Sequence, residues 1–412
     1  MSESNKFENV AIVGAGLAGL TLALALHQQS IPVTVYESRP APLNIGGAVM
    51  LSPNALQILD ALDLYHIVKT KGYNFETLDY RDLAGNLLES YEFGSKDKYG
   101  YKGLRIFRHV LIDELVAALA QRGVTVRYGT KFSHVVADSP RGVTVAFTDG
   151  STASASVLVG ADGIHSAVRK HLYPDLQTKF IGMAGITAAV PTTQLKLPPG
   201  YHIPVTIISP KGAFVIAPQQ VDGSEVLIGK QQRVVLNDVQ PGWDREFVAD
   251  KESGVKFLQQ DNELFPEIVH NAASHIDTDT VNKWPFFVVP KLERWASESR
   301  GVIIVGDAAH AIPPSASQGI NQAFEDVYML ALLLGQADRI RSIKDALSFW
   351  QSYRQERVDK VLELNKQIDL RRMPADDAVV GDKSGFQRKE FELGWLYKPE
   401  FKKDVQDWIS RQ

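Results

Sequence analysis

The stretch VAIVGAGLAGLTLALALHQ, from Val10 to Gln28, decides the fold of this chain. Its four apolar residues Val10–Val13 predict a short strand, its glycines turn the chain, and Leu17–Gln28 has the spacing of a buried helix. The following PVTVY at Pro32–Tyr36 predicts a second strand. A strand, a glycine turn, a helix and a strand in this order are typical of a nucleotide-binding domain.

Each glycine of the turn has its own expected role. Gly14 permits the tight turn, Gly16 lets backbone amides approach a pyrophosphate, and Gly19 lets the helix pack closely on the strand. Glu37 ends the second strand, where a carboxylate accepts hydrogen bonds from both ribose hydroxyls of the adenosine. The cofactor-binding residues predicted in this region are Gly14, Ala15, Gly16, Leu17, Ala18, Gly19, Glu37, Ser38 and Arg39.

Two further motifs follow strand-like apolar runs. ADG lies at Ala161–Gly163, after Val157–Val159. GDAAHAIPPSASQGINQAFED runs from Gly306 to Asp326, after Val302–Val305. One glycine-rich turn is weak evidence for any cofactor, but the three motifs in this order point to FAD.

Composition bounds the remaining possibilities. The 412 residues are 44% hydrophobic and 22% charged, enough for two units with sizeable cores. The net charge of -4 comes from interspersed acids and bases, so neither nucleic acid nor an anionic membrane is an expected partner. There are no cysteines, and the ten histidines do not cluster at ligand spacing, so no metal site is expected.

No targeting or spanning segment is expected. The first residues, MSESNKFENV, are polar and unlike a secretory signal. The longest apolar stretch near the end, Val327–Leu334, is far shorter than the roughly 20 residues that span a bilayer. We expect a soluble cytoplasmic protein, a monomer or a homodimer.

Between the first and second motifs, predicted helices alternate with predicted strands. Gly46–Tyr65 predicts a glycine turn followed by an amphipathic helix that buries Leu56, Leu59, Leu62 and Leu64. Leu78–Tyr91 predicts a hairpin, and Arg105–Leu119 predicts a helix. Further strands are expected at Val124–Tyr128, Phe132–Ala137 and Val143–Phe147.

Beyond Phe180 the texture changes to short strands between Pro and Gly turns, which is typical of an antiparallel sheet. The expected strands are Val205–Ile208, Ala213–Ala217, Glu225–Ile228 and Phe286–Val289. One helix is expected at Arg245–Gln260, and a long packing helix at Ser342–Arg372.

The predicted fold class is therefore α/β. It consists of a Rossmann-like, glutathione-reductase-type FAD-binding domain, an inserted and mainly antiparallel substrate domain, and C-terminal helices. The FAD-binding domain is predicted to be discontinuous, over 1–75, 103–180 and 290–340. The substrate domain is predicted over 76–102 and 181–289, and the helical region over 341–412.

From Val10 to about Arg357 the chain resembles the class A (single-component) FAD-dependent monooxygenases, the family of para-hydroxybenzoate hydroxylase and salicylate hydroxylase. The family's motifs fall on Gly14, Gly16, Gly19, Glu37, Gly46-Gly47-Ala48, Pro53-Asn54-Ala55, Arg108, Asp162-Gly163 with Arg169 downstream, Gly306-Asp307, Pro313-Pro314 and Gly319-Ile320-Asn321.

The resemblance implies roles for several of these residues. Arg108 would bind the FAD pyrophosphate, and Asp307 the ribityl or ribose portion. Gly47, Ala48, Asp162, Gly163, Ile320 and Asn321 are included among the cofactor-binding residues. The helix that opens at Gly319 would point its free amides at the anionic end of reduced flavin and stabilise it by about 1 kcal/mol. Pro313 and Pro314 would form a wall beside the flavin without N–H donors.

The same resemblance implies the reaction. NADPH or NADH would reduce FAD, and O2 would add at flavin C4a. The resulting hydroperoxide would insert one oxygen atom into a small molecule by hydroxylation or epoxidation. Baeyer-Villiger insertion stays open.

Ser317 stands where the family commonly has glycine, which is a departure from the family's pattern in the loop that follows Pro313-Pro314.

The substrate is less legible. Many aromatic-acid hydroxylases of this family have Trp-Arg-Gly where this chain has Gly185-Ile186-Thr187-Ala188-Ala189, so no arginine is available there for a carboxylate. We expect a neutral or bulky aromatic, heteroaromatic, polyketide-like or alkaloid-like substrate of secondary metabolism. Tyr201, Phe214, Phe286 and Phe287 are candidates for the pocket lining or for the core. His202 and His310 are candidate bases, and His310 lies in a motif with an expected structural role.

Three other functions are compatible with parts of the sequence to different degrees. An FAD-dependent reductase or dehydrogenase that does not activate O2 would share most of the motifs. A flavin-dependent halogenase would show a Trp-x-Trp-x-Ile-Pro segment, which the sequence lacks. A non-enzymatic FAD-binding module stays a minor possibility.

Overall fold

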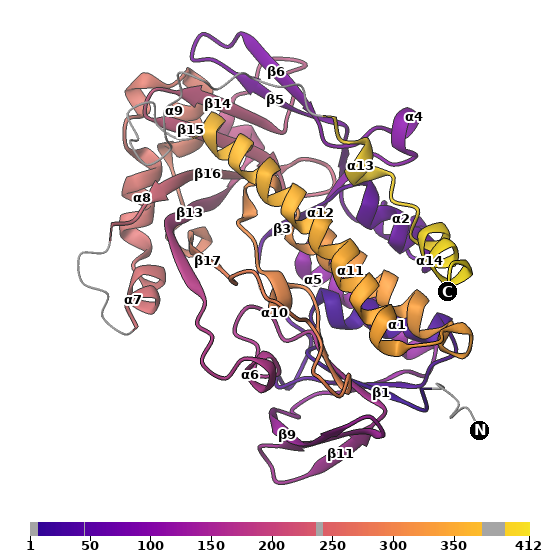
Figure 1. The fold of residues 1–412 in the computed structure, drawn as a ribbon. Helices are drawn as coiled ribbons and strands as arrows, with labels where there is room; N and C mark the ends of the chain where they lie inside the picture. The colour runs from indigo at the N-terminus through magenta and orange to yellow at the C-terminus, as the bar shows by residue number, and fades with distance from the viewer. Residues whose placement is uncertain (1–6, 45, 236–241, 373–391) are drawn as a thin grey trace.

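The fold is seen in a computed structural model that describes residues 7–44, 46–235, 242–372 and 392–412 (Figure 1). A five-stranded parallel sheet carries the first and second motifs, with strand order β18-β12-β1-β2-β8. Its strands are β1 (Val10–Val13), β2 (Val33–Tyr36), β8 (Thr125–Arg127), β12 (Val157–Gly160) and β18 (Val302–Ile304). The expected parallel sheet is confirmed.

Helices α1 (Leu17–Gln28), α5 (Arg108–Gln121) and α11 (Gly319–Leu334) pack together beside this sheet. Their side chains share one core with the strands, in which Ile12, Leu20 and Phe324 are fully buried. Helix α1 has the predicted bounds, because its apolar residues are buried on nearly every side.

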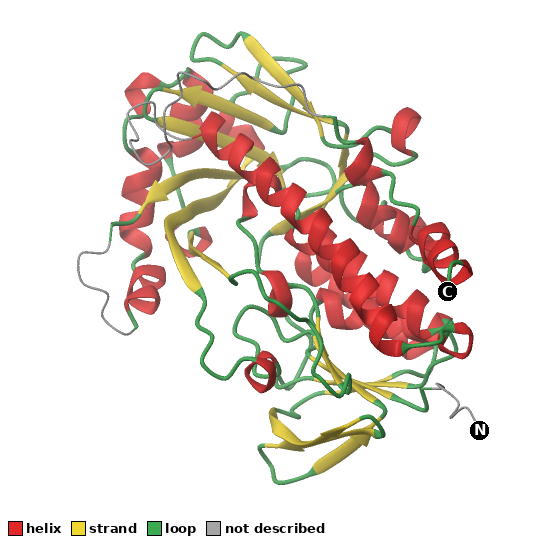
Figure 2. Cartoon of the chain, in the orientation of Figure 1, coloured by secondary structure: helices red, strands yellow, loops and turns green. Residues whose placement is uncertain are grey.

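A seven-stranded sheet forms the second layer, in the order β17-β13-β16-β15-β14-β5-β6 (Figure 2). Its strands are β5 (Thr77–Arg81), β6 (Leu87–Glu92), β13 (Lys179–Pro191), β14 (Val205–Ser209), β15 (Gly212–Pro218), β16 (Glu225–Arg233) and β17 (Asn282–Val288). The pairing of β14 with β5 is parallel and the others are antiparallel. The predicted hairpin is confirmed, and it extends a sheet whose other strands come more than 85 residues later.

The two faces of this sheet differ. Helices α8 (Lys251–Gln259) and α9 (Glu267–Ser274) cover one face, and the apolar side chains between them and the strands form a separate core. In Figure 1 these helices lie on the far side of the sheet from α11 and α12. We call the opposite side, which carries Gly185, Thr187 and Gln231, the open face.

Two three-stranded sheets complete the β structure. One has the order β3-β7-β4, with β3 (Ala48–Leu51), β7 (Gly103–Phe107) and β4 (Tyr73–Phe75). The other has the order β11-β10-β9, with β9 (Phe132–Ser139), β10 (Gly142–Phe147) and β11 (Thr152–Ala155).

Three sequence predictions are corrected. A strand, β3, stands between the Gly46-Gly47 turn and helix α2 (Pro53–Ala61). The helix predicted from Arg105 begins at Arg108, because Arg105–Phe107 pairs in β7 with β3 and β4. Arg245–Gln260 is split into α7 (Trp243–Ala249) and α8 at Asp250, whose carboxylate accepts from the Ser253 amide at 3.1 Å and caps α8.

The described residues of the C-terminal part, 341–372 and 392–412, are largely helical, as predicted. The 30-residue α12 (Ile343–Arg372) lies across α11, followed by α13 (Gly394–Tyr397) and α14 (Phe401–Ser410). Trp408 stacks on Phe349 with ring centroids 4.9 Å apart, and Tyr397 is buried. The remaining helices are α3 (Tyr65–Val68), α4 (Lys96–Tyr99), α6 (Arg169–Leu172), α10 (Asp307–His310) and short 3-10 turns.

Among the described residues, no helix is both long and apolar enough to cross a bilayer. The predicted division into domains stays a prediction.

Candidate active site

The glycines of the first motif meet different surroundings. A Cβ on Gly14, whose φ is +106°, would lie 2.5 Å from the carbonyl oxygen of Ala161, and one on Gly19 would lie 1.9 Å from that of Gly14. A Cβ on Gly16 would meet no atom within 4 Å. The packing of the protein therefore requires Gly14 and Gly19, while Gly16 leaves open space at the N-terminus of α1, where a pyrophosphate fits.

Glu37 fastens the end of β2 to the glycine turn. Its carboxylate is 3% exposed and accepts from the amide of Ala15 at 2.8 Å, the amide of Arg39 at 2.9 Å and the hydroxyl of Ser38 at 3.0 Å. Burial alone would raise the pKa of Glu37, but the hydrogen bonds from Arg39 and Ala15 lower it. The carboxylate is thus ionised, and a ribose would share it with these donors.

The second motif is an internally bonded turn. Asp162 accepts from the amides of Ala167 at 2.7 Å and Val168 at 3.1 Å and from the hydroxyl of Ser166. Burial raises the pKa of Asp162, and these hydrogen bonds oppose the rise. Gly163, with φ +76°, turns the chain next to it. Asp162 therefore braces the turn with contacts inside the protein.

Arg169 joins the second motif to the third. Its guanidinium donates to the carbonyl of Ile164 and, at 2.9 Å, to the carbonyl of Ala308. Arg169 is only 4% exposed. The two loops that follow β12 and β18 are therefore held at a fixed separation.

Asp307 interacts electrostatically with Arg108 and His310. Its side chain is exposed to solvent, although protein surrounds it closely enough that desolvation raises its pKa, against the attraction of His310 and Arg108. Burial likewise lowers the pKa of Arg108, where Asp307 opposes the shift and Arg39 adds to it. The open turn at Gly46 lies beside the Arg108 side chain. This grouping suits the middle of an extended dinucleotide.

The loop at Pro313–Ser317 is held from behind by α12. Asn365 accepts from the amide of Ala316 at 2.6 Å, and Asp369 accepts from the hydroxyl of Ser315. Burial raises the pKa of Asp369, while hydrogen bonds from Ser315 and from Gln231 of the open face lower it. Asp369 thus connects this loop to the open face.

Ser317 has φ +55°, the left-handed conformation that glycine adopts most easily. The serine therefore keeps the backbone conformation for which glycine is better suited, at a strain of about 1 kcal/mol. Pro313 and Pro314 are each partly exposed beside it.

Helix α11 begins at Gly319, where a Cβ would meet no atom within 4 Å. Asn321 accepts from the Ser52 amide at 2.9 Å and donates to the carbonyls of Met50 at 3.1 Å and Ser317 at 2.7 Å. Its side chain therefore fastens β3 to α11. Ile320 is partly exposed next to it.

The Gly47-Ala48 turn approaches the substrate sheet from the other side. The amide of Ala48 donates to the side chain of Gln219 at 3.2 Å, and a Cβ on Gly47 would lie 3.3 Å from the same oxygen. Residues of the predicted cofactor site thus border the end of β15.

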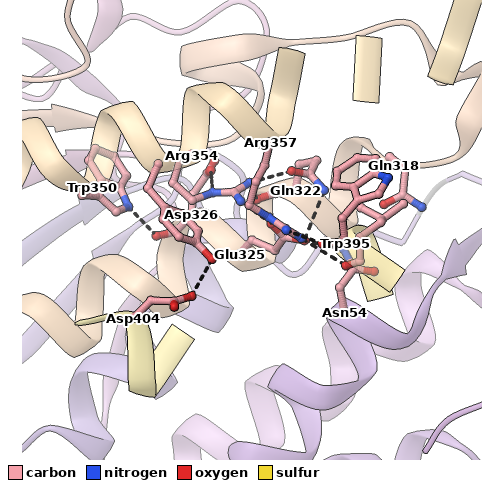
Figure 3. A network of polar contacts seen from close by, with 12 residues as sticks. Asn54, Gln318, Gln322, Glu325, Asp326, Trp350, Arg354, Arg357, Trp395 and Asp404 are labelled. Atoms are coloured by element: carbon pink, nitrogen blue, oxygen red, sulfur yellow. Dashed lines mark hydrogen bonds and ion pairs between the residues drawn. The ribbon is translucent and has the colours of Figure 1, made fainter. Parts of the chain in front are cut away.

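A buried ionic network that we did not predict supports this arrangement (Figure 3). Glu325 and Asp326 on α11 face Arg354 and Arg357 on α12, and all four are buried. Arg354 donates to both carboxylates, at 2.8 Å to Asp326, and Arg357 donates to Glu325 at 2.6 and 2.7 Å. The side-chain amide of Asn54 donates a further hydrogen bond to Glu325 at 2.6 Å.

Each half of this network is visible in the sequence, although the pairing of the two halves is not. Two adjacent acids interrupt an otherwise apolar helix, and two arginines stand three residues apart on the next one. Burial alone would raise the pKa values of Glu325 and Asp326, but arginine, and His310 for Asp326, hold both below their usual range.

The candidate bases lie in different places. Nε2 of His310 contacts the carboxylate of Asp326, and its ring packs 5.0 Å from that of Trp295, so its contacts are structural. Nε2 of His202 lies 2.9 Å from the carbonyl of Thr77 and 3.2 Å from its hydroxyl. His202 therefore bonds to the backbone at the start of β5.

The candidate pocket residues also separate. Phe214 is fully buried and packs on Phe265 under the helical layer, because its pleat position points away from the open face. Phe287 packs on Trp243 of α7. Neither lies on the open face, so of the two alternatives, pocket lining or core packing, their contacts favour packing.

Phe286 lies beside Gly185 on the open face, where a Cβ on Gly185 would approach its ring at 3.3 Å. Tyr201 lies under the guanidinium of Arg81, 5.2 Å from the ring centroid.

Comparisons with known proteins agree with this geometry. The model of a family described as FAD binding domain matches residues 8–365. The 3-amino-4-hydroxybenzoate 2-monooxygenase PtmB3 of Streptomyces platensis is 32% identical over 349 residues, 81% of each chain. The hispidin-3-hydroxylase of Neonothopanus nambi is 26% identical over 86% of this chain and 87% of its own. A salicylate hydroxylase substrate complex superposes with a TM-score of 0.77 at 22% identity, over 98% of both chains.

Proposed function

Since the chain belongs to the FAD binding domain family and is an FAD-dependent monooxygenase, we propose that it hydroxylates an aromatic small molecule with NADPH or NADH as electron donor. The substrate would lie between the Pro313–Ser317 loop and the open face. Its named relatives are monooxygenases, which favours this function over a reductase that leaves O2 unused.

The observation that carries the proposal is the space left at two helix N-termini. The positions of Gly16, before α1, and Gly319, at the start of α11, both face open space. The free amides there would bind the pyrophosphate at one end and the flavin ring at the other. In this proposal Glu37, Arg108 and Asp307 would hold the ribose, phosphate and ribityl portions between them.

FAD, when bound, would take up electrons from the nicotinamide and use them to activate O2. The residues of this chain would do the rest. Pro313 and Pro314 offer no N–H groups and exclude water from the reacting centre. The N-terminus of α11 would stabilise negative charge by about 1 kcal/mol. Asn321 and Asp369 would fix the two sides of this wall through their bonds to β3 and Ser315.

An aromatic ring suits the open face. Gly185 and Gly229 contribute no side chains there, and Thr187 and Phe286 contribute a methyl group and a ring. A relative acts on 3-amino-4-hydroxybenzoate and another on hispidin, according to their names, and both molecules contain hydroxylated rings. We propose that molecules with a hydroxylated aromatic ring are among the substrates of this chain.

The test is oxygen incorporation. The purified FAD-loaded protein would be given NADPH or NADH, ¹⁸O2 and 3-amino-4-hydroxybenzoate or hispidin, and the products analysed by mass spectrometry. A product that carries one ¹⁸O atom, with nicotinamide oxidation accelerated by the aromatic compound, is expected. Reduction of the compound in the absence of O2 would identify a reductase and contradict the proposal.

We also propose that the chain acts in the cytoplasm as a monomer or homodimer and consists of the three regions predicted above. Mass measurement of the FAD-loaded protein by light scattering tests the assembly, and a larger species would overturn it.

A further inference from the structure

Arg105 differs from the other buried arginines of the described chain. Arg169, Arg354, Arg357 and Arg371 each donate to a carbonyl or a carboxylate. Arg105 is 6% exposed, its Nε is buried without a partner, and within the described residues its guanidinium makes no hydrogen bond or ion pair. Burial alone lowers its pKa, to about 10, so it stays charged at neutral pH.

The register of β7 shows which way Arg105 points. It stands directly opposite Met50 of β3 and Tyr73 of β4, and residues directly opposite in antiparallel strands share a face. The neighbours Leu104 and Ile106 point to the other face, into the core of the FAD-binding part. Arg105 therefore points away from that core.

The face that carries Arg105 meets the site from two sides. Met50 and Tyr73 pack on the cluster that contains Ala316, and Ile312 packs there too, so the proline loop lies near. Gly223, in the turn between β15 and β16, approaches the ring of Tyr73. Arg105 thus lies where the small sheet, the proline loop and the substrate sheet come together.

An unpaired buried guanidinium destabilises a fold unless a ligand pairs with it. The pyrophosphate is the natural partner of Arg108, which lies beside Gly46 and near Asp307. Arg105, three residues earlier, is in the strand rather than at the start of α5. A ligand group other than the pyrophosphate is needed to pair with it.

We propose that Arg105 determines substrate specificity by pairing with an anionic oxygen, a carboxylate or a phenolate, on the aromatic substrate. This inference rests on the proposed function. It replaces the expectation of a neutral substrate, because β7 supplies the positive charge that residues 185–189 lack. The named substrate of the 32% identical relative carries such a carboxylate.

The experiment compares matched ligands on the FAD-loaded protein, without nicotinamide, by the change in flavin absorbance. The pairs are 3-amino-4-hydroxybenzoate with its amide and salicylate with salicylamide. The acid of at least one pair should bind the native protein about 10- to 100-fold more tightly. If preference is lost on methylating the ring hydroxyl rather than on amidation, the phenolate is the paired group.

Three variants at one position separate specificity from structure. Arg105→Gln and Arg105→Met should abolish the preference, and Arg105→Lys should keep part of it. Arg122→Gln removes an arginine at the end of α5, which bonds to carbonyls away from the site, and should change nothing. All variants should retain FAD.

Thermal unfolding gives a second readout that a merely structural arginine would not share. Arg105→Met removes an unpaired buried charge, so its melting temperature without ligand should equal or exceed that of the native protein. The acids should raise the melting temperature of the native protein but not that of Arg105→Met. Retained preference in Arg105→Gln, loss of FAD, or no preference in the native protein would each overturn the assignment. Oxygen incorporation is measured separately, so the proposed function can stand when this inference fails.

Discussion

Nε of Arg354 donates to Oδ1 of Asp326 at 2.8 Å, and neither side chain is exposed to solvent. The other oxygen of Asp326 accepts from the amide of Gly306 at 2.9 Å. Helix α12 is therefore joined through one carboxylate to the turn that presents Asp307. This relationship makes a helix distant in sequence part of the support of the cofactor site.

Replacing Arg354 by Met should be strongly destabilising. It leaves Glu325 and Asp326 buried with one fewer cation, and breaking such a pair costs about 3–5 kcal/mol. Urea unfolding of the FAD-loaded protein measures the change. Lys360→Met, which removes an exposed pair with Glu356 on the same helix, should change stability by less than about 0.5 kcal/mol. Equal effects of the two substitutions would contradict a supporting role of the network.

Gly16→Ala and Gly19→Ala should fail in different ways. A Cβ at position 16 has free space within the protein, so Gly16→Ala should fold normally but bind FAD at least about tenfold more weakly, because the methyl group lies where the pyrophosphate approaches. Gly19→Ala places its Cβ against a carbonyl and should unfold at lower temperature. Calorimetry with and without FAD distinguishes them, and unchanged affinity in Gly16→Ala would argue against this binding mode.

The pH dependence of the FAD-free protein should report Asp307. Its pKa is raised by desolvation, so the folded protein keeps this proton to a higher pH than the unfolded chain does. Stability from this group is therefore greatest at low pH and falls as the pH rises from the unfolded to the folded pKa. Asp307→Asn should lack this component of the slope, which begins above the ordinary aspartate pKa of about 4.

The same variant should bind FAD about 10- to 100-fold more weakly, because it loses a charged hydrogen-bond acceptor. Fluorescence titration measures the affinity. A variant that shows an unchanged slope and unchanged affinity would remove Asp307 from the site.

Asp369→Ala should uncouple the reaction. Without its bond to Ser315, the proline loop loses one of its supports from α12, and water enters more easily. Nicotinamide oxidation should continue, with more hydrogen peroxide and less hydroxylated product per NADPH or NADH consumed. Lys366→Ala, an exposed position of the same helix, serves as the control. Full coupling in Asp369→Ala would show that the bond from Asp369 to Ser315 is not needed to keep water out.

The sequence predicts the nucleotide-binding half closely because its signals are local. The turn at Gly14–Gly19 is decided by contacts within the motif and with the neighbouring loop, and α1 has its predicted bounds. Strands β3 and β7 escape prediction because their burial comes from strands of other segments. Their apolar residues read equally well as part of the helices that follow.

The side chains that support the site are predicted less well for the same reason. Arg354 and Asp326 are 28 positions apart, and no local pattern indicates that they meet. Arg105 lies among residues from three separate segments, so its lack of a partner is visible only in three dimensions. Phe214 stays undecided between pocket and core in the sequence, because alternation along β15 does not reveal which face the helices cover.

The parallel pairing of β14 with β5 has a consequence for how this protein is made. The β5–β6 hairpin leaves the ribosome more than a hundred residues before β14. Until β14 is synthesised, the edge of β5 that pairs with it stays unpaired. The parallel sheet is completed later still, because its edge strand β18 follows the whole inserted sheet in the sequence. The seven-stranded sheet is therefore fully synthesised before the parallel sheet is, and exchanging the substrate-binding unit between relatives would require two separate grafts rather than one.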